Sequence, residues 1–281
     1  MPDVVVRGWP VVLLSTAAGL IAAPAVARAR IALLAETHVG NTVELSLTAT
    51  NAGSETVARL VPEVVFQHDT YRGLELVALA PSADHRWELR LAPVPGPGTF
   101  PLTILTRYQR SDGTAGTALL VVLATTPGAP EAGVRAGLSA PPLGRGQATT
   151  ARLSLSNTLA QPVAGRVAVL LPSALKISPE SQPAEVPANG NLELPLVIER
   201  RDAEPEVPYS VFALFEFEAS GVHHSVLASI ILEVPAVSTW EARRPFFIGS
   251  AALAFALAVC GVALRLAAAR ANARRMAESG Q

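Results

Sequence analysis

The stretch from Gly40 to Asn51, GNTVELSLTATN, alternates apolar and polar residues. Its apolar members share one parity, and they are Val43, Leu45, Leu47 and Ala49. Successive side chains of a β-strand point to opposite faces, so this period of two predicts a strand with one buried face. The sequence Asn-Ala-Gly-Ser that begins at Asn51 has the composition of a turn, which is expected to end the strand.

Further apolar segments follow at short intervals, with turn residues between them. In the first half of the chain we expect strands over residues 57–66, 74–80, 87–91, 100–108 and 117–123. Ser111-Asp112-Gly113, between the last two, has the composition of a hairpin turn. No segment of this half has the 3.6-residue spacing of an amphipathic helix. About seven short strands without a helix predict an all-β fold in the form of a β-sandwich.

The second half of the chain repeats this pattern. Residues 146–157 read GQATTARLSLSN, and both stretches run from a glycine to an asparagine. The aromatic-led segment 100–108 corresponds in the same way to residues 209–217. A repeat of about 100 residues indicates duplicated domains rather than a solenoid. We therefore expect two sandwiches, and a short Pro-bearing linker that keeps them end to end. The expected ranges are 30–126 for the first sandwich, 127–137 for the linker and 138–235 for the second sandwich.

Both halves share further features around these strands. Residues 50–57 read TNAGSETV and residues 156–163 read SNTLAQPV, so each of these strands ends in an asparagine. A Pro-containing turn then precedes an E-L-x-L strand, which begins at Glu88 and at Glu193. With the aromatic-led hairpin that closes each half, the region 30–234 resembles the bacterial immunoglobulin-like modules of the CARDB and alpha-galactosidase-associated type. This resemblance implies tandem immunoglobulin-like sandwiches with a spacer, adhesion or partner-binding role, and it implies no shared catalytic residues.

The segment Phe246–Leu264, FFIGSAALAFALAVCGVAL, contains no charged residue. At about 1.5 Å per residue, a helix of this length spans a bilayer core of about 30 Å. We therefore expect one C-terminal transmembrane helix over residues 245–264 and a basic tail over residues 265–281. Since cytoplasmic segments carry the excess of arginine, we expect a single-pass protein of the cytoplasmic membrane. Its C-terminus is then cytoplasmic, and the bulk of the chain is periplasmic or extracellular.

A second apolar stretch lies near the N-terminus. Residues 10–23 are apolar apart from Ser15 and Thr16, and Ala25-Val26-Ala27 has the small-x-small pattern of a cleavage site. Residues 1–29 are therefore predicted to be a secretory signal peptide. An uncleaved anchor remains the alternative, because about 18 apolar residues can span a bilayer.

Several side chains are expected at the membrane surface. Trp240 lies in the juxtamembrane segment 236–244, and an indole is favoured at the membrane interface. Arg243 and Arg244 precede the helix and Arg265 follows it, where their side chains can contact lipid phosphates.

Within the predicted helix, Ala252, Ala256 and Cys260 fall four residues apart. Small residues at this spacing let helices approach closely, so our hypothesis is a packing face toward a partner helix. Cys260 is the only cysteine of the chain. The outer part therefore has no intramolecular disulfide, and burial of apolar cores must stabilise its domains.

The outer part of the chain is acidic. From Arg30 to Glu241 there are 14 basic and 21 acidic residues, a net charge of −7. Nucleic-acid binding needs clustered cations, so this balance argues against a nucleic-acid partner. We expect membrane lipid and an integral membrane or envelope protein as partners, and an envelope polysaccharide is the alternative.

Few residues have a pattern that indicates chemistry. His223 and His224 are adjacent, and neighbours in a strand point to opposite faces, so both cannot easily reach one metal ion. His68, Asp69 and Tyr71 fall in a polar segment that we interpret as a solvated loop. The acidic residues near Arg200 lack the oxygen-ligand register and glycine of a calcium loop. We therefore expect no catalytic group, no metal site and no cofactor.

The aromatic-led segment 209–217 leaves one question open. Phe212 and Leu214 have the parity opposite to Tyr209, Phe215 and Phe217, and so they are expected on the outer face of a sheet. They form either a docking surface or a face that the neighbouring domain or a loop covers. The expected function is a non-catalytic structural or accessory subunit that binds a protein partner, and the alternative is a polysaccharide-binding or adhesion module.

Overall fold

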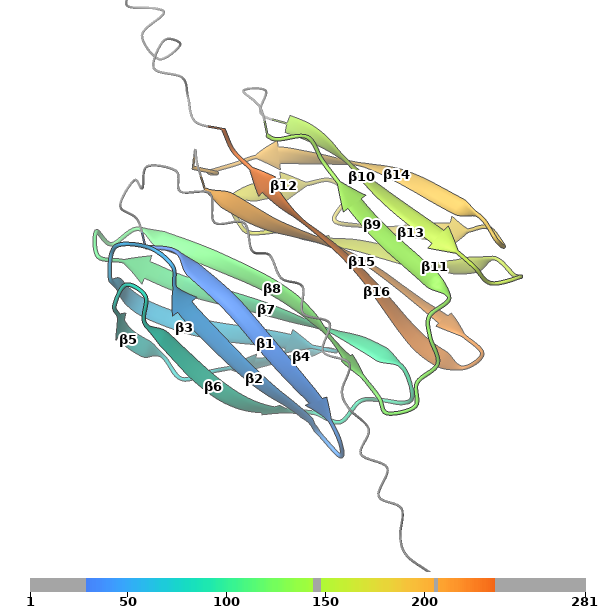
Figure 1. Cartoon of the computed structure of the whole chain (residues 1–281), viewed down its shortest axis with the longest axis horizontal. Helices are drawn as coiled ribbons and strands as arrows, with labels where there is room; N and C mark the ends of the chain where they lie inside the picture. Colours follow the sequence, from blue (N-terminus) through green and yellow to red (C-terminus); the bar gives the residue numbers. More distant parts are fainter. Residues whose placement is uncertain (1–28, 144–147, 205–206, 236–281) are drawn as a thin grey trace, which may run out of the picture.

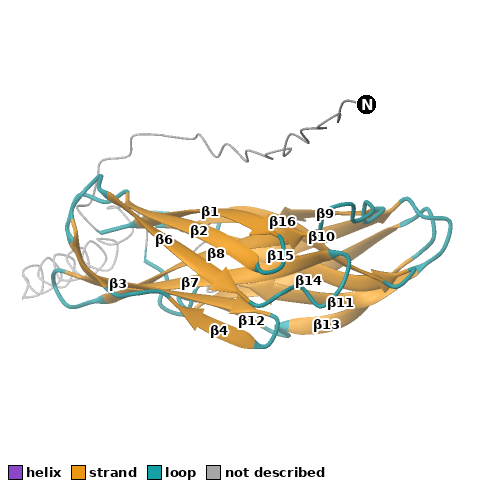
Figure 2. Ribbon diagram, turned by 90° about the horizontal axis from the view of Figure 1, so that it is seen from below, coloured by secondary structure: helices purple, strands orange, loops and turns teal. Residues whose placement is uncertain are grey.

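The computed structural model describes residues 29–143, 148–204 and 207–235, which contain strands and loops only (Figure 2). These residues form two β-sandwiches, coloured from blue to green and from green to orange in Figure 1. The strands of the first sandwich are β1 (Ile31–Val39), β2 (Val43–Asn51), β3 (Val57–Phe66), β4 (Asp69–Arg72), β5 (Leu76–Leu79), β6 (Asp84–Leu91), β7 (Thr99–Arg110) and β8 (Ala115–Thr125). The strands of the second are β9 (Val134–Ser139), β10 (Ala148–Asn157), β11 (Val163–Leu170), β12 (Leu175–Ile177), β13 (Ser181–Val186), β14 (Asn191–Arg200), β15 (Pro208–Ala219) and β16 (Val222–Glu233).

The two sandwiches share one strand order. In the first, the sheets run β1-β2-β6 and β4-β3-β7-β8, and β5 also pairs with β3. In the second, they run β9-β10-β14-β12 and β16-β15-β11-β13. Neighbouring strands are antiparallel, and β1, β2, β3, β6, β7 and β8 match β9, β10, β11, β14, β15 and β16 in place. This order is that of tandem immunoglobulin-like sandwiches, which confirms the all-β prediction.

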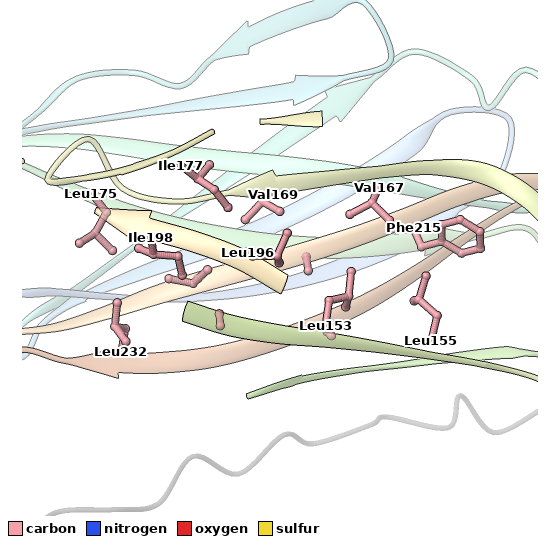
Figure 3. Packing of buried hydrophobic residues seen from close by; sticks show 14 of the residues in the cluster. Leu153, Leu155, Val167, Val169, Leu175, Ile177, Leu196, Ile198, Phe215 and Leu232 are labelled. Carbon is pink, nitrogen blue, oxygen red and sulfur yellow. The ribbon is translucent and has the colours of Figure 1, made fainter. Parts of the chain in front are cut away.

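Each sandwich has its own core, built from residues that alternate in the sequence. Val43, Leu45, Leu47 and Ala49 on β2 are all 0% exposed, as the period of two predicted. Figure 3 shows the second core, in which Leu153 and Leu155 on β10 lie across from Val167 on β11 and Phe215 on β15. Two separate apolar clusters of this kind let each half bury its own surface without a disulfide.

The asparagine that ends the second strand makes equivalent hydrogen bonds in both sandwiches. Asn51 is fully buried, and its Nδ2 donates to the carbonyls of Glu55 (2.8 Å) and Leu79 (3.0 Å). Asn157 is 2% exposed, and its Nδ2 donates to the carbonyls of Gln161 (2.9 Å) and Pro187 (3.0 Å). In both turns the Oδ1 accepts from the backbone N–H two residues later. The side chain thus satisfies buried backbone groups that the turn removes from the ladders.

Three segments differ from the sequence-based expectation. β1 was not expected, because Leu33 and Leu34 are adjacent apolar residues and Leu34, which is 64% exposed, obscures the period of two. The loop expected at His68 and Asp69 is in part a strand, since β4 pairs with the end of β3. β9 begins at Val134, so the last residues of the expected linker belong to the second sandwich.

The sandwiches lie side by side, not end to end as the short linker suggested (Figure 1). The outer face of β7 and β8 packs against the outer face of β15 and β16. The linker turns back at Gly128 and Gly133, which have φ of 77° and 63°. Such backbone is accessible to glycine at little cost, and it allows the chain to reverse between β8 and β9.

The predicted membrane-associated segments lie outside the described residues, and these are residues 1–28, the juxtamembrane segment, the span 245–264 and the tail. Within the ranges 29–143, 148–204 and 207–235 there is no helix of the length and hydropathy that a bilayer span requires.

Candidate functional site: the contact and cleft between the sandwiches

An apolar cluster joins the two sandwiches. Leu119 and Val121 on β8 are 9% and 3% exposed, and they pack against Phe212 on β15, which is 6% exposed. Leu105 on β7 and Leu227 on β16 border this cluster. The outer faces of the two sheets are therefore apolar where they meet, which is the reason they are buried against each other.

The burial of Phe212 and Leu214 shows whether their face is exposed for docking or covered. Both side chains are on the outer face of β15, as their parity indicated, but Phe212 is covered by the first sandwich and Leu214 is only 3% exposed. They do not form an exposed docking surface. For Phe212, the alternative in which the neighbouring domain covers this face is the one that the structure shows.

An ion pair closes one end of the contact. Nη1 of Arg110, at the end of β7, donates to Oε1 of Glu204 at 2.8 Å, and Nη2 lies 3.5 Å from Oε2. The Arg110 side chain is only 12% exposed, and its hydrogen bond to Glu204 raises the pKa of the guanidinium. Nε of Arg110 is buried without a hydrogen-bond partner within the described residues. The pair thus holds two charges between the sandwiches in a charge-assisted geometry.

The loop that carries Glu204 is held in turn by Tyr209. The backbone N–H of Glu204 donates to the Tyr209 hydroxyl at 2.7 Å. Burial raises the pKa of the Tyr209 phenol, which therefore stays neutral at physiological pH.

The adjacent histidines lie at the other end of the contact. The His223 ring stacks on Phe100 of the first sandwich, with centroids 4.8 Å apart, and its backbone N–H donates to the Pro97 carbonyl at 3.3 Å. His224 points the opposite way, is 3% exposed and stacks on Phe217 at 5.1 Å. Burial lowers the pKa of His224. The pair faces two directions, and no group of three or more metal-ligating side chains occurs in the part of the chain that the structure describes.

A cleft of about 560 Å³ opens between the sandwiches at the Arg110 end. Its apolar lining comes from both domains and includes Leu33, Leu119, Phe212 and Ile231. Its charged lining consists of Arg30, Arg110, Arg201, Asp202 and Glu204. Clefts of this size between domains are common places for small ligands or partner side chains. The described lining contains no histidine or cysteine, and its hydroxyl side chains include Tyr108, Ser173 and Ser210.

The sequence contains no pattern that predicts this cleft. Arg30, Arg110 and Arg201 come from three distant segments, and each is an ordinary charged residue at the end of a strand or in a loop. Of the polar residues His68, Asp69 and Tyr71, Tyr71 has a structural role, since its hydroxyl accepts a hydrogen bond from the backbone N–H of Ala92 at 2.9 Å. The predicted membrane-interface and helix-packing residues lie outside the described ranges, and they are Trp240, Arg243, Arg244, Ala252, Ala256, Cys260 and Arg265.

No protein-family model matches the sequence, and no curated protein matches it. Among solved structures, the chain is similar to a Y1175G mutant of Salmonella alpha-2-macroglobulin at 12% identity and a TM-score of 0.32, over 75% of this chain and 16% of that chain. It is similar to red sea bream transglutaminase at 12% identity and a TM-score of 0.29, over 75% of this chain and 32% of that chain. A protein of unknown function from Porphyromonas gingivalis W83 matches at 14% identity and a TM-score of 0.26, over 71% and 99% of the two chains. The chain thus spans a minor part of the first two proteins, and its immunoglobulin-like description rests on the strand order given above.

Proposed function

We propose that this chain is a non-catalytic, membrane-anchored extracytoplasmic protein. It acts as a structural or accessory subunit that presents its paired sandwiches to a protein partner of a membrane or envelope complex. The sandwiches are modules of the CARDB type, and the span 245–264 holds them at the cytoplasmic membrane with the C-terminus in the cytoplasm.

The observation that supports this proposal is where the first strand begins and the last strand ends. Arg30, next to the first described residue, and Ile231, near the end of β16, line the same cleft. The C-terminal apolar stretch therefore attaches to the end of the body at which the first strand begins. A body attached at one end leaves its other surfaces free for a partner.

The contact between the sandwiches supports a spacer role. It is closed by Arg110 and Glu204 at one end, by Phe100 and His223 at the other, and by the apolar cluster around Phe212 between them. Three sets of contacts over the length of the sheets oppose rotation about the linker. A pair held in this way presents surfaces of both domains at a constant spacing.

The side-chain distribution favours a protein partner over a polysaccharide. Sugar-binding surfaces commonly use exposed aromatic rings as platforms. Every Phe, Tyr and Trp side chain in the described ranges is buried or half-buried, including Trp87, Phe100 and Tyr108. The polysaccharide alternative therefore has less support.

Co-purification tests the proposal. The tagged full-length chain would be purified in mild detergent beside a variant in which residues 246–264 are replaced by an unrelated spanning helix, and bound proteins would be identified by mass spectrometry. A stoichiometric partner that is kept in the variant places recognition in the sandwiches, and a partner that is lost places it in the helix. Absence of any partner, together with binding of the chain to envelope glycans, would reject the proposal in favour of its alternative.

A further inference from the structure

The cleft between the sandwiches lies close to the predicted anchor. The described chain ends at Pro235, and ten residues separate it from Phe246, where the predicted span begins. Ten fully extended residues reach at most about 36 Å. The mouth of the cleft is thus on the side of the body that the chain ties to the membrane.

The lining of the cleft differs in charge from the body. The outer part carries 14 basic against 21 acidic residues, whereas the charged lining consists of three arginines and two carboxylates. Glu204 is bonded to Arg110, and Asp202 lies 3.7 Å from Nε of Arg201. Arg30 and Arg201 are exposed, one from each sandwich. An acidic body with a locally cationic cleft is oriented by an anionic membrane so that the cleft faces it.

The cleft also offers apolar surface at its mouth. Ile231 is 53% exposed, on the outer face of the last strand, and it lines the cleft together with Leu33 and Phe212. A large apolar side chain so near the predicted anchor can be buried among the lipid acyl chains just below the headgroups. Guanidinium groups bind phosphate through paired N–H donors and can extend their apolar stems along lipid.

We propose that this cleft receives the phosphate headgroup of an anionic membrane lipid, bound between Arg30 of the first sandwich and Arg201 of the second, with Ile231 against the lipid chains. The inference rests on the proposed membrane anchor and adds an orientation to it. The paired sandwiches stand with the cleft toward the bilayer. The β1–β2 turn at Asn41 lies at the end of β1 opposite Arg30 (Figure 1), and so on the side that faces away from the bilayer in this orientation.

The test is proximity to lipid headgroups in the full-length chain. Cys260 would be replaced with alanine, and a fluorophore would be attached to a single new cysteine at the cleft (Ser173→Cys) or at the far turn (Asn41→Cys). Both sites are exposed, and Ser173 lines the cleft. The chains would be placed in nanodiscs of phosphatidylcholine alone or with phosphatidylglycerol, each containing a lipid with a nitroxide on its headgroup as quencher.

We expect strong quenching at Ser173→Cys and little at Asn41→Cys, with more quenching in the discs that contain phosphatidylglycerol. The variant Arg30→Gln/Arg201→Gln should lose this lipid preference, by a factor of about five for each arginine removed. Arg86→Gln/Arg90→Gln, which removes the same charge from the edge strand β6, should keep it. Inorganic phosphate in the buffer should not reproduce the effect of phosphatidylglycerol.

Two results overturn the inference separately from the proposed function. A chain that stays in the disc but shows equal quenching at both sites has an anchor and no oriented cleft. Quenching at Ser173→Cys that is the same with and without Arg30 and Arg201 rejects the headgroup site. A chain that is washed from the disc by alkaline carbonate would overturn the anchor, and the inference with it.

Discussion

Asn51 in the first sandwich and Asn157 in the second make matching hydrogen bonds, whereas the matching positions on the outer faces of β7 and β15 carry different residues. Thr103 on β7 lies opposite Val121 on β8, and at the equivalent place Phe212 on β15 lies opposite Ser229 on β16. The large apolar residue is thus Val121 on the edge strand β8 in the first sandwich, but Phe212 on the inner strand β15 in the second. Each half therefore repeats what its own core and turns need, and the two halves are complementary where they pack together.

The largest effect is expected when the asparagines of the two equivalent turns are replaced. Asn51→Ala leaves the carbonyls of Glu55 and Leu79 and one backbone N–H without a partner, and Asn157→Ala does the same in the second sandwich. Each change should lower the free energy of unfolding by about 3 kcal/mol. Urea unfolding of the full-length chain in mild detergent, followed by circular dichroism, measures it. Asn41→Ala, at an exposed turn, should have little effect, and a large difference between the two buried sites would contradict the equivalence of the turns.

The next test removes Phe212, whose counterpart in the first sandwich is Thr103. Phe212→Ala deletes the centre of the apolar cluster between the sandwiches, and we expect a loss of about 2 kcal/mol because the domains can separate and partly solvate the cavity. In a background with Trp9→Phe and Trp240→Phe, the buried Trp87 reports on the first sandwich. Its fluorescence transition should then separate from the circular-dichroism transition of the whole chain. Thr103→Ala, at the matching position, is the control. Unchanged, coincident transitions in the Phe212 variant would show that the cluster does not couple the domains.

A smaller effect is expected at the ion pair. Arg110→Met keeps much of the apolar stem but removes the hydrogen bonds to Glu204, and the loss should be about 1 kcal/mol because the pair is partly solvated. Small-angle scattering should show a larger radius of gyration if this end of the contact opens. Arg152→Met, which removes a surface pair with Glu193, serves as the comparison. An Arg110→Met protein with unchanged stability and unchanged scattering would show that the apolar cluster alone holds the sandwiches together.

The smallest effect concerns pH. Burial lowers the pKa of His224, so the folded chain binds this proton less readily than the unfolded chain. Stability from this residue is therefore present above the unfolded pKa of about 6.5 and is lost as the pH falls below it. His224→Gln should reduce the difference between unfolding at pH 7.5 and at pH 5, and His38→Gln, at an exposed site, should not. An unaltered pH dependence in His224→Gln would assign the effect to another group.

Local patterns predicted much of the fold. The period of two in residues 43–49 identified β2 and its buried face, and the repeated asparagine identified two equivalent turns, because both depend on neighbours in the sequence. The pattern failed at β1, where adjacent leucines obscure the alternation, and at β4, which exists only because β3 offers an edge to pair with. The parity of Phe212 predicted an outward side chain correctly. It left open what covers that side chain, since parity describes a face and not its neighbour.

Two all-β domains with duplicated turns and separate cores follow from the sequence alone, because strand alternation and turn composition are local properties. The sequence also carries the prediction of a membrane span at residues 245–264. The side-by-side packing of the sandwiches, the ion pair of Arg110 with Glu204, and the position of Arg30 and Arg201 at one cleft are visible only in the folded chain. These residues are far apart along the chain, and their meeting depends on the complementary shapes of two sheet faces, which no local pattern records.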